Sequence, residues 1–177
     1  MTVPKADPRV SHVESHWTLR WQVVLAAYMQ LILWIPLGRW NYQPCCPTGW
    51  TQLTRGTLTL ADALLGFAFV LPLVTFWLAD RRGWRWAMWI AFAAYAVWLA
   101  LQLVSWWVPY LLGASARWAA VYNRAFAQET QILPRWGRHL PPDAMHLVLQ
   151  ALLVAVLWTG IPALRRGRAA AAASPAL

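Results

Sequence analysis

Residues 86–112 read WAMWIAFAAYAVWLALQLVSWWVPYLL, a run without a single charged side chain. It is longer than the roughly 20 helical residues that cross the hydrocarbon core of a bilayer. Residues 17–38, 58–79 and 144–164 form three further long and mostly apolar runs. None alternates strictly between apolar and polar residues, as a membrane β-strand does, and in lipid a helix satisfies its own backbone hydrogen bonds. The sequence therefore predicts an all-α integral membrane protein, with four transmembrane helices in an antiparallel bundle.

The composition of the whole chain supports the same class. The 177 residues are 60% hydrophobic and 12% charged, whereas soluble domains average about 45–50% and about 25%. A soluble enzyme domain and a disordered chain are both excluded as descriptions of the whole. The 15 tryptophans suit a protein anchored at two membrane interfaces. The net charge of +9 is spread between the apolar runs rather than gathered on one face, so it predicts no nucleic-acid partner.

The basic residues predict the orientation, because short cytoplasmic loops carry an excess of Lys and Arg. The turn at 80–85 holds three arginines in six residues, which favours placing it and both termini in the cytoplasm. The predominance of arginine over lysine, with abundant alanine, indicates a bacterial source, so the expected location is the bacterial cytoplasmic (inner) membrane. Residues 1–16 are then a cytoplasmic arm, 17–164 the transmembrane domain, and 165–177 a basic, alanine-rich and disordered cytoplasmic tail.

Most of the remaining polar chain falls on the outer side, in a loop at 39–57 and a segment at 113–143. A helix over 114–133 would be amphipathic and lie along the interface, before a turn-rich connector that leads to Asp143. Asp143 is placed to cap the fourth span. Glu129 falls on the apolar face of the expected helix, which indicates a buried partner such as an arginine, or a helix that ends before it. The candidate residues of this outer surface are Trp118, Tyr122, Arg124, Phe126 and Glu129.

The two cysteines, Cys45 and Cys46, are adjacent and lie in the outer loop. A disulfide between neighbours would be strained and easily reduced, as suits a redox switch. Three other interpretations are open: inert thiols, cysteines that pair between chains, and ligands of a soft metal. Together with His139 and His146, the two cysteines could also form a tetrahedral zinc site.

Four membrane helices with outward-facing cysteines resemble the architecture of quinone-linked disulfide-generating enzymes and vitamin K epoxide reductases. Those families use a C-x-x-C pair and a second shuttle pair, and this chain has neither. The vicinal pair Cys45–Cys46 is similar to the one that mercuric-ion transport proteins carry near the outer end of their first helix, without their second pair. These resemblances imply a quinone or a soft metal; apart from them, no cofactor is expected.

Polar residues inside the spans are candidates for function. Asp62 is either the N-cap of the second span or a group that pairs with an arginine or handles protons. Gln30, Gln102 and Gln150 lie within the first, third and fourth spans, where a glutamine commonly forms hydrogen bonds between helices.

The sequence favours a non-enzymatic scaffold, assembly factor or binding subunit that acts through its outer face. The first alternative is a membrane thiol redox protein that uses Cys45 and Cys46. The second is a small transporter of a soft metal or a hydrophobic solute. The expected partners are the lipid bilayer and other membrane proteins or further copies of this chain.

Overall fold

The computed structural model describes residues 8–35, 37–40 and 55–172. This part of the chain contains five α-helices and one short 3-10 helix, and it contains no β-strand. The helices are α1 (Pro8–Trp34), α2 (Arg55–Arg82), α3 (Arg85–Leu112), α4 (Ala116–Ala125) and α5 (Ala144–Ala172), with the 3-10 helix at Gly38–Trp40. The prediction of an all-α protein is confirmed.

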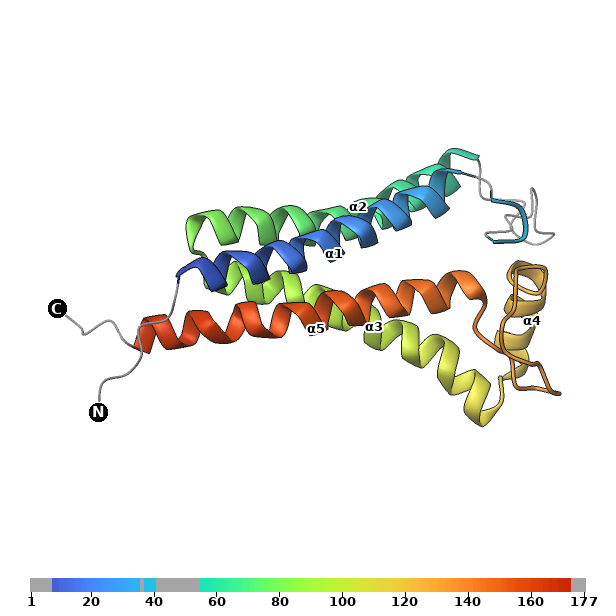
Figure 1. Cartoon of the computed structure of the whole chain (residues 1–177). Helices are drawn as coiled ribbons and strands as arrows, with labels where there is room; N and C mark the ends of the chain where they lie inside the picture. Colours follow the sequence, from blue (N-terminus) through green and yellow to red (C-terminus); the bar gives the residue numbers. More distant parts are fainter. Residues whose placement is uncertain (1–7, 36, 41–54, 173–177) are drawn as a thin grey trace.

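The four long helices lie side by side, and α4 lies across one end of them (Figure 1). α1 packs against α2 and α5, and α3 packs against the same two helices. One end of the molecule holds Arg20, Arg81, Arg82, Arg85 and Arg165, and we call it the arginine end. The opposite end, where α1 and α3 finish and α5 begins, is the α4 end.

Three stretches in the described residues are long and apolar enough to cross a membrane. They are Ala63–Arg82 in α2, Arg85–Leu112 in α3 and Ala144–Arg165 in α5. These stretches match three of the four predicted spans and indicate a membrane protein. α1 is not among them, because Arg20, Gln22 and Gln30 interrupt its apolar residues. The fourth crossing therefore stays a prediction.

Several helix ends differ from the predicted ones. α1 ends at Trp34 rather than at residue 38, because the ring of Pro36 disfavours the helical conformation in the residue before it. α2 begins at Arg55, so Asp62 lies inside the helix and the prediction that it is the N-cap is wrong. No proline interrupts the chain between these two residues, and the helix runs through them.

The two ends of the chain are more helical than expected. α1 begins at Pro8, within the predicted arm, and proline is well suited to the first position of a helix because its missing N–H would have no partner there. α5 continues to Ala172, within the predicted disordered tail, where four consecutive alanines have the highest helix propensity of any residue.

Three groups of buried side chains form the core. The central group joins all four long helices and includes Leu25, Phe69, Tyr95 and Leu153. A second group fills the arginine end. Here Phe92 lies directly against Gly160, and a β-carbon on Gly160 would be 1.6 Å from the tip of the ring. The third group, Trp106, Ala114, Tyr122 and Leu140, lies beneath α4.

Candidate functional site

α4 is shorter than the predicted helix at 114–133. It is capped by Ser115, whose side chain accepts a hydrogen bond from the Trp118 backbone N–H at 3.1 Å, and its last residue is Ala125. The chain then turns, and the Thr130 N–H donates to the Arg39 carbonyl at 2.7 Å instead of to a carbonyl of its own helix. Ile132, which falls within the predicted helix, lies beyond α4 and is exposed. The predicted length is wrong because hydrogen bonds to other parts of the fold end the helix early.

The aromatic residues predicted for the outer surface do come together. Trp118, Tyr122 and Phe126 all pack around Trp106 of α3, with ring centroids 5.8, 6.2 and 5.0 Å from it. The side chain of Arg124, the other predicted member, lies outside the described residues. Trp106 also lies over the imidazole of His146, at a centroid distance of 4.1 Å. The aromatic group therefore covers the first turn of α5.

Two backbone contacts bring Glu129 beside the start of α5. Thr130 accepts a hydrogen bond from the Ala144 N–H at 2.7 Å, and Gln131 forms an isolated β-bridge with Asp143. The Tyr122 hydroxyl donates to the Pro141 carbonyl at 3.0 Å and ties α4 to the same connector. Residues 129–131 and 141–144 are thus held side by side.

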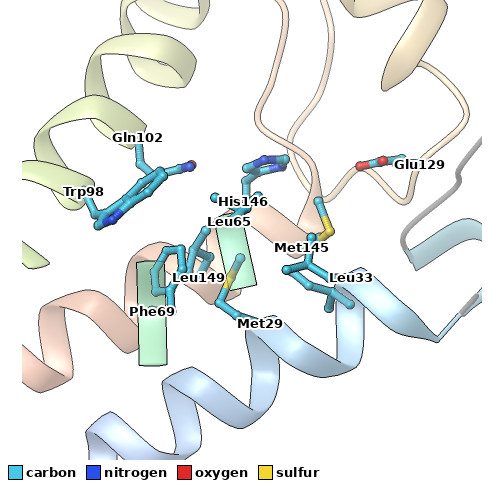
Figure 2. Close-up of a pocket in the computed structure, with 11 residues that line it drawn as sticks. Met29, Leu33, Leu65, Phe69, Trp98, Gln102, Glu129, Met145, His146 and Leu149 are labelled. Atoms are coloured by element: carbon cyan, nitrogen blue, oxygen red, sulfur yellow. The ribbon is translucent and has the colours of Figure 1, made fainter. Parts of the chain in front are cut away.

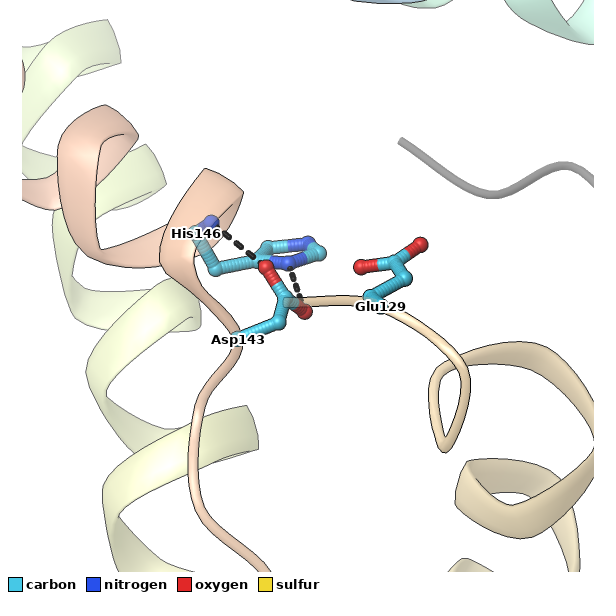
Figure 3. Close-up of side chains that lie close together, drawn as sticks. All are labelled: Glu129, Asp143 and His146. Atoms are coloured by element: carbon cyan, nitrogen blue, oxygen red, sulfur yellow. Dashed lines mark hydrogen bonds and ion pairs between the residues drawn. The ribbon is translucent and has the colours of Figure 1, made fainter. Parts of the chain in front are cut away.

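Asp143 caps α5, as the sequence predicts. Its Oδ1 accepts a hydrogen bond from the His146 backbone N–H at 2.8 Å, and its Oδ2 lies 2.6 Å from Nδ1 of the same histidine (Figure 3). Asp143 is fully buried, and 13% of the His146 side chain is exposed. Burial alone would raise the pKa of Asp143, but the hydrogen bonds and the charge that His146 presents hold this pKa below its usual range.

Glu129 is the third member of this group. It is 5% exposed, and its carboxyl group faces the Asp143–His146 pair (Figure 3). Its Oε2 atom has no hydrogen-bond partner among the described residues. Burial, together with the negative charge of Asp143, raises the pKa of Glu129 to about 9. One oxygen or nitrogen atom from each of Glu129, Asp143 and His146 lies within 4.8 Å of the others. We call these three residues the carboxyl–histidine cluster.

The cluster borders a cavity of about 170 Å³ between the long helices. In Figure 2 the polar side chains of Gln102, His146 and Glu129 lie along its upper side. The Oε1 atom of Gln102 is buried and has no partner in the part of the chain that the structure describes. The other walls are apolar and come from all four long helices: Met29, Ile32, Leu33, Leu65, Phe69, Trp98, Met145 and Leu149.

Two of the three predicted glutamines join helices. Nε2 of Gln30 donates to the Gly66 carbonyl at 3.0 Å and links α1 to α2. Oε1 of Gln150 accepts a hydrogen bond from the Trp107 indole at 2.7 Å and links α5 to α3. Gln22, which is not among the predicted residues, is fully buried, and its amide has no partner among the described residues. Its position four residues after the buried Thr18 and three before the buried Leu25 was the available signal, because this spacing keeps one helix face.

The predicted zinc site of Cys45, Cys46, His139 and His146 stays a prediction, and its two histidines have different neighbours. Nδ1 of His139 lies 2.8 Å from the Tyr110 carbonyl, and its ring packs against Trp136, whereas His146 belongs to the carboxyl–histidine cluster. Cys45 and Cys46 lie outside the described residues, as does the side chain of Asp62. The sequence does not predict that Asp143 and Glu129 lie close together, because they are 14 positions apart in two irregular segments and no helical or strand periodicity relates them.

The chain matches no protein-family model, no curated protein and no solved structure.

Proposed function

We propose that this chain is a binding subunit that crosses the bacterial cytoplasmic membrane four times. In this proposal both termini are cytoplasmic and α4 lies along the outer interface. The function is to hold a small, largely apolar molecule in the cavity at the α4 end. The observation that carries it is a cavity with apolar walls and one polar side, formed by all four long helices.

The packing of α1 supports a fourth crossing. The Thr18 hydroxyl donates to the Thr159 carbonyl and the Tyr28 hydroxyl to the Met145 carbonyl, both at 2.9 Å, so α1 follows α5 over most of its length. Val23, Val24 and Leu31 are exposed on the other side of α1. A row of exposed apolar side chains along a long helix fits a lipid-facing surface and not a water-facing one. α1 therefore has the length and the lipid-facing side that a transmembrane helix needs.

The arginine end has the character of a cytoplasmic interface. The guanidinium groups of Arg20 and Arg81 lie over the rings of Trp17 and Trp77, at 5.0 and 4.2 Å from the ring centroids. Arg82 lies over Trp84 in the same way, at 4.8 Å. Tryptophan is enriched at the level of the lipid headgroups, and arginine is enriched on the cytoplasmic side. This pairing supports placing the arginine end inside and α4 outside.

The cavity is of the size that a single small ring fills. A 150 Å³ cavity lined by apolar side chains in another protein holds benzene, and this one measures about 170 Å³. The unpartnered oxygen of Gln102 on its polar side can accept a hydrogen bond from a hydroxyl group, and the carboxyl group of Glu129, when protonated, can donate one to a carbonyl group. The favoured ligand is therefore a ring of phenol size with one or two oxygen substituents, a class that includes the head groups of quinols.

The test fills the cavity and measures whether phenol still binds. Leu149→Trp adds volume from a side chain that lines the cavity, whereas Val154→Trp places the same group on the exposed side of the same helix. Saturation-transfer difference NMR of phenol with the purified protein in deuterated detergent should give a signal for wild type and for Val154→Trp. Leu149→Trp should lose that signal and keep the helical circular dichroism spectrum.

A second filling variant, Leu65→Trp, places the larger side chain in the cavity from α2. It keeps the proposal testable if Leu149→Trp does not fold. Equal phenol signals in wild type and in both filling variants would show that phenol is bound elsewhere, in the micelle or on the surface. No signal in wild type would reject the proposed function directly.

A further inference from the structure

We propose that Glu129, Asp143 and His146 bind a divalent first-row transition-metal cation, of which Zn²⁺ is the probe of choice. The three residues offer two carboxylates and one imidazole from two segments of the chain, next to the cavity. This inference concerns the same end of the molecule as the proposed function, but it does not depend on the ligand of the cavity.

The charges of the cluster are balanced only when a cation or protons lie among them. Asp143 is fully buried, and only 5% of the surface of Glu129 is exposed. Two buried carboxylates so close together cannot both stay ionised unaided, because each loses its hydration and repels the other. A divalent cation neutralises both carboxylates at once.

The unpartnered oxygen of Glu129 points to a missing ligand. Buried polar atoms in folded proteins are nearly always hydrogen-bonded or bound to an ion. Oε2 of Glu129 has no partner among the described residues, and Figure 3 shows its carboxyl group directed toward the Asp143–His146 pair. No arginine or lysine appears in the set of residues that lines the cavity or in the cluster. A cation bound among the three groups gives this oxygen the partner that it lacks.

The donor set and its spacing decide the class of metal. Imidazole favours zinc, iron and related metals over calcium or magnesium, which prefer oxygen ligands alone. Bonds of about 2.0–2.2 Å hold the ligand atoms of a tetrahedral zinc roughly 3.4 Å apart. The donor atoms here lie within 4.8 Å of one another, so a contraction on the order of one ångström completes the site. A cation among them replaces the proton between Asp143 Oδ2 and His146 Nδ1, and these atoms, now 2.6 Å apart, separate by about 0.8 Å to reach the same spacing.

The surroundings hold the three ligands in place and leave one side of the site open. Asp143 and His146 are fixed in the first turn of α5, and Trp106 and Phe126 enclose the imidazole. The segment that carries Glu129 is held by the hydrogen bonds of Thr130. Both Glu129 and His146 also line the cavity, so a small oxygen ligand or water can take the remaining coordination position.

The test measures zinc binding in a Cys45→Ser, Cys46→Ser background, which removes the thiols as competing ligands. The full-length protein is purified in detergent, stripped with EDTA, and titrated with Zn²⁺ by isothermal titration calorimetry. We expect about one equivalent of Zn²⁺ per chain, and binding at least tenfold weaker in Glu129→Gln and in His146→Ala. Co²⁺ added to the stripped protein should show the visible absorption bands of a site with nitrogen and oxygen ligands.

His139→Ala is the matched control, because it removes a histidine at the same end of the molecule that is not part of the cluster. This variant should bind zinc like the parent, and Mg²⁺ should not compete. The proposal is overturned if the stripped parent binds no zinc, or if Glu129→Gln and His146→Ala both bind it as tightly as the parent. Phenol binding is measured separately in the EDTA-stripped protein to distinguish the two proposals. Phenol binding without zinc binding would reject only the metal site, and zinc binding without phenol binding would reject only the proposed function.

Discussion

At the scale of single residues, the position of Glu129 has the largest chemical consequence. Its carboxyl group lies away from water and beside a carboxylate that already accepts hydrogen bonds from His146. In the metal-free protein Glu129 therefore keeps its proton at neutral pH, since burial and the charge of Asp143 raise its pKa to about 9. A raised pKa in the folded state makes stability depend on pH.

We expect the metal-free protein to lose stability as the pH rises from 5.5 to 8, relative to Glu129→Gln. Unfolded, Glu129 ionises near its ordinary pKa of 4.5, whereas folded it holds its proton up to about 9. The contribution of Glu129 to the free energy of unfolding is therefore complete below pH 4.5 and is lost toward pH 9. The free energy of unfolding changes by at most about 1.4 kcal/mol per pH unit through this group. Asp143, whose pKa is lowered, changes stability only in acid, below this range.

Thermal melting of both proteins in detergent with EDTA measures this difference. The glutamine variant has nearly the same shape and cannot ionise, so all other titrating groups cancel in the comparison. If the melting temperatures of the two proteins differ by the same amount at every pH, Glu129 is ionised in the folded protein.

The residues of the cluster differ in how far the sequence predicts them. Asp143 as the cap of α5 and His146 in the following turn follow from local rules, because a cap and its helix are neighbours in the chain. The place of Glu129 on the apolar face of the expected helix predicts either a buried partner such as an arginine or a helix that ends before it, and α4 does end before Glu129. Its real neighbours depend on a bridge between Gln131 and Asp143, which a local pattern does not contain.

At the scale of the elements, three predicted spans agree closely with helices because twenty apolar residues leave a chain few alternatives in lipid. The residues at which helices end are harder to predict. α4 ends early because Thr130 binds Arg39, from a segment 91 residues away. α2 begins well before Asp62, since nothing between Arg55 and Asp62 prevents a helix. Such ends are decided by tertiary contacts or by weak propensities.

The contact between α3 and α5 gives a prediction for Gly160→Ala. In a helix, alanine normally stabilises by about 1 kcal/mol over glycine. Here the added β-carbon would overlap the Phe92 ring, so the substitution should instead destabilise the protein by about 1–3 kcal/mol. The melting temperature of Gly160→Ala should fall below that of wild type.

Phe92→Leu, which replaces the ring with a smaller side chain, tests whether the Phe92 ring causes the loss of stability. Gly160→Ala should cost less in the Phe92→Leu background than in wild type, as a double-mutant cycle measures. A stabilising effect of Gly160→Ala in wild type would contradict the close packing of these two helices.

At the scale of the whole molecule, the orientation in the membrane is a direct prediction. Cys45 and Cys46 lie between α1 and α2 in the chain, and α1 finishes at the α4 end. In intact spheroplasts, after mild reduction, a membrane-impermeant maleimide should therefore label them.

The control places a single cysteine at the other end. Asp80→Cys is exposed near the arginine end, and in a background with both native cysteines changed to serine it should react only after the membrane is permeabilised. The reverse pattern, with the native cysteines protected and Cys at position 80 labelled, would mean that the protein is inserted the other way round.

The contact of Phe92 with Gly160 also bears on how α3 and α5 can move against each other. Between these two residues there is no space for even a methyl group, while toward α4 the same two helices, together with α1 and α2, border a cavity. This contact therefore resists separation of α3 and α5 near the arginine end. We expect a molecule to enter and leave the cavity from the α4 end, which the proposed orientation places in the outer half of the membrane.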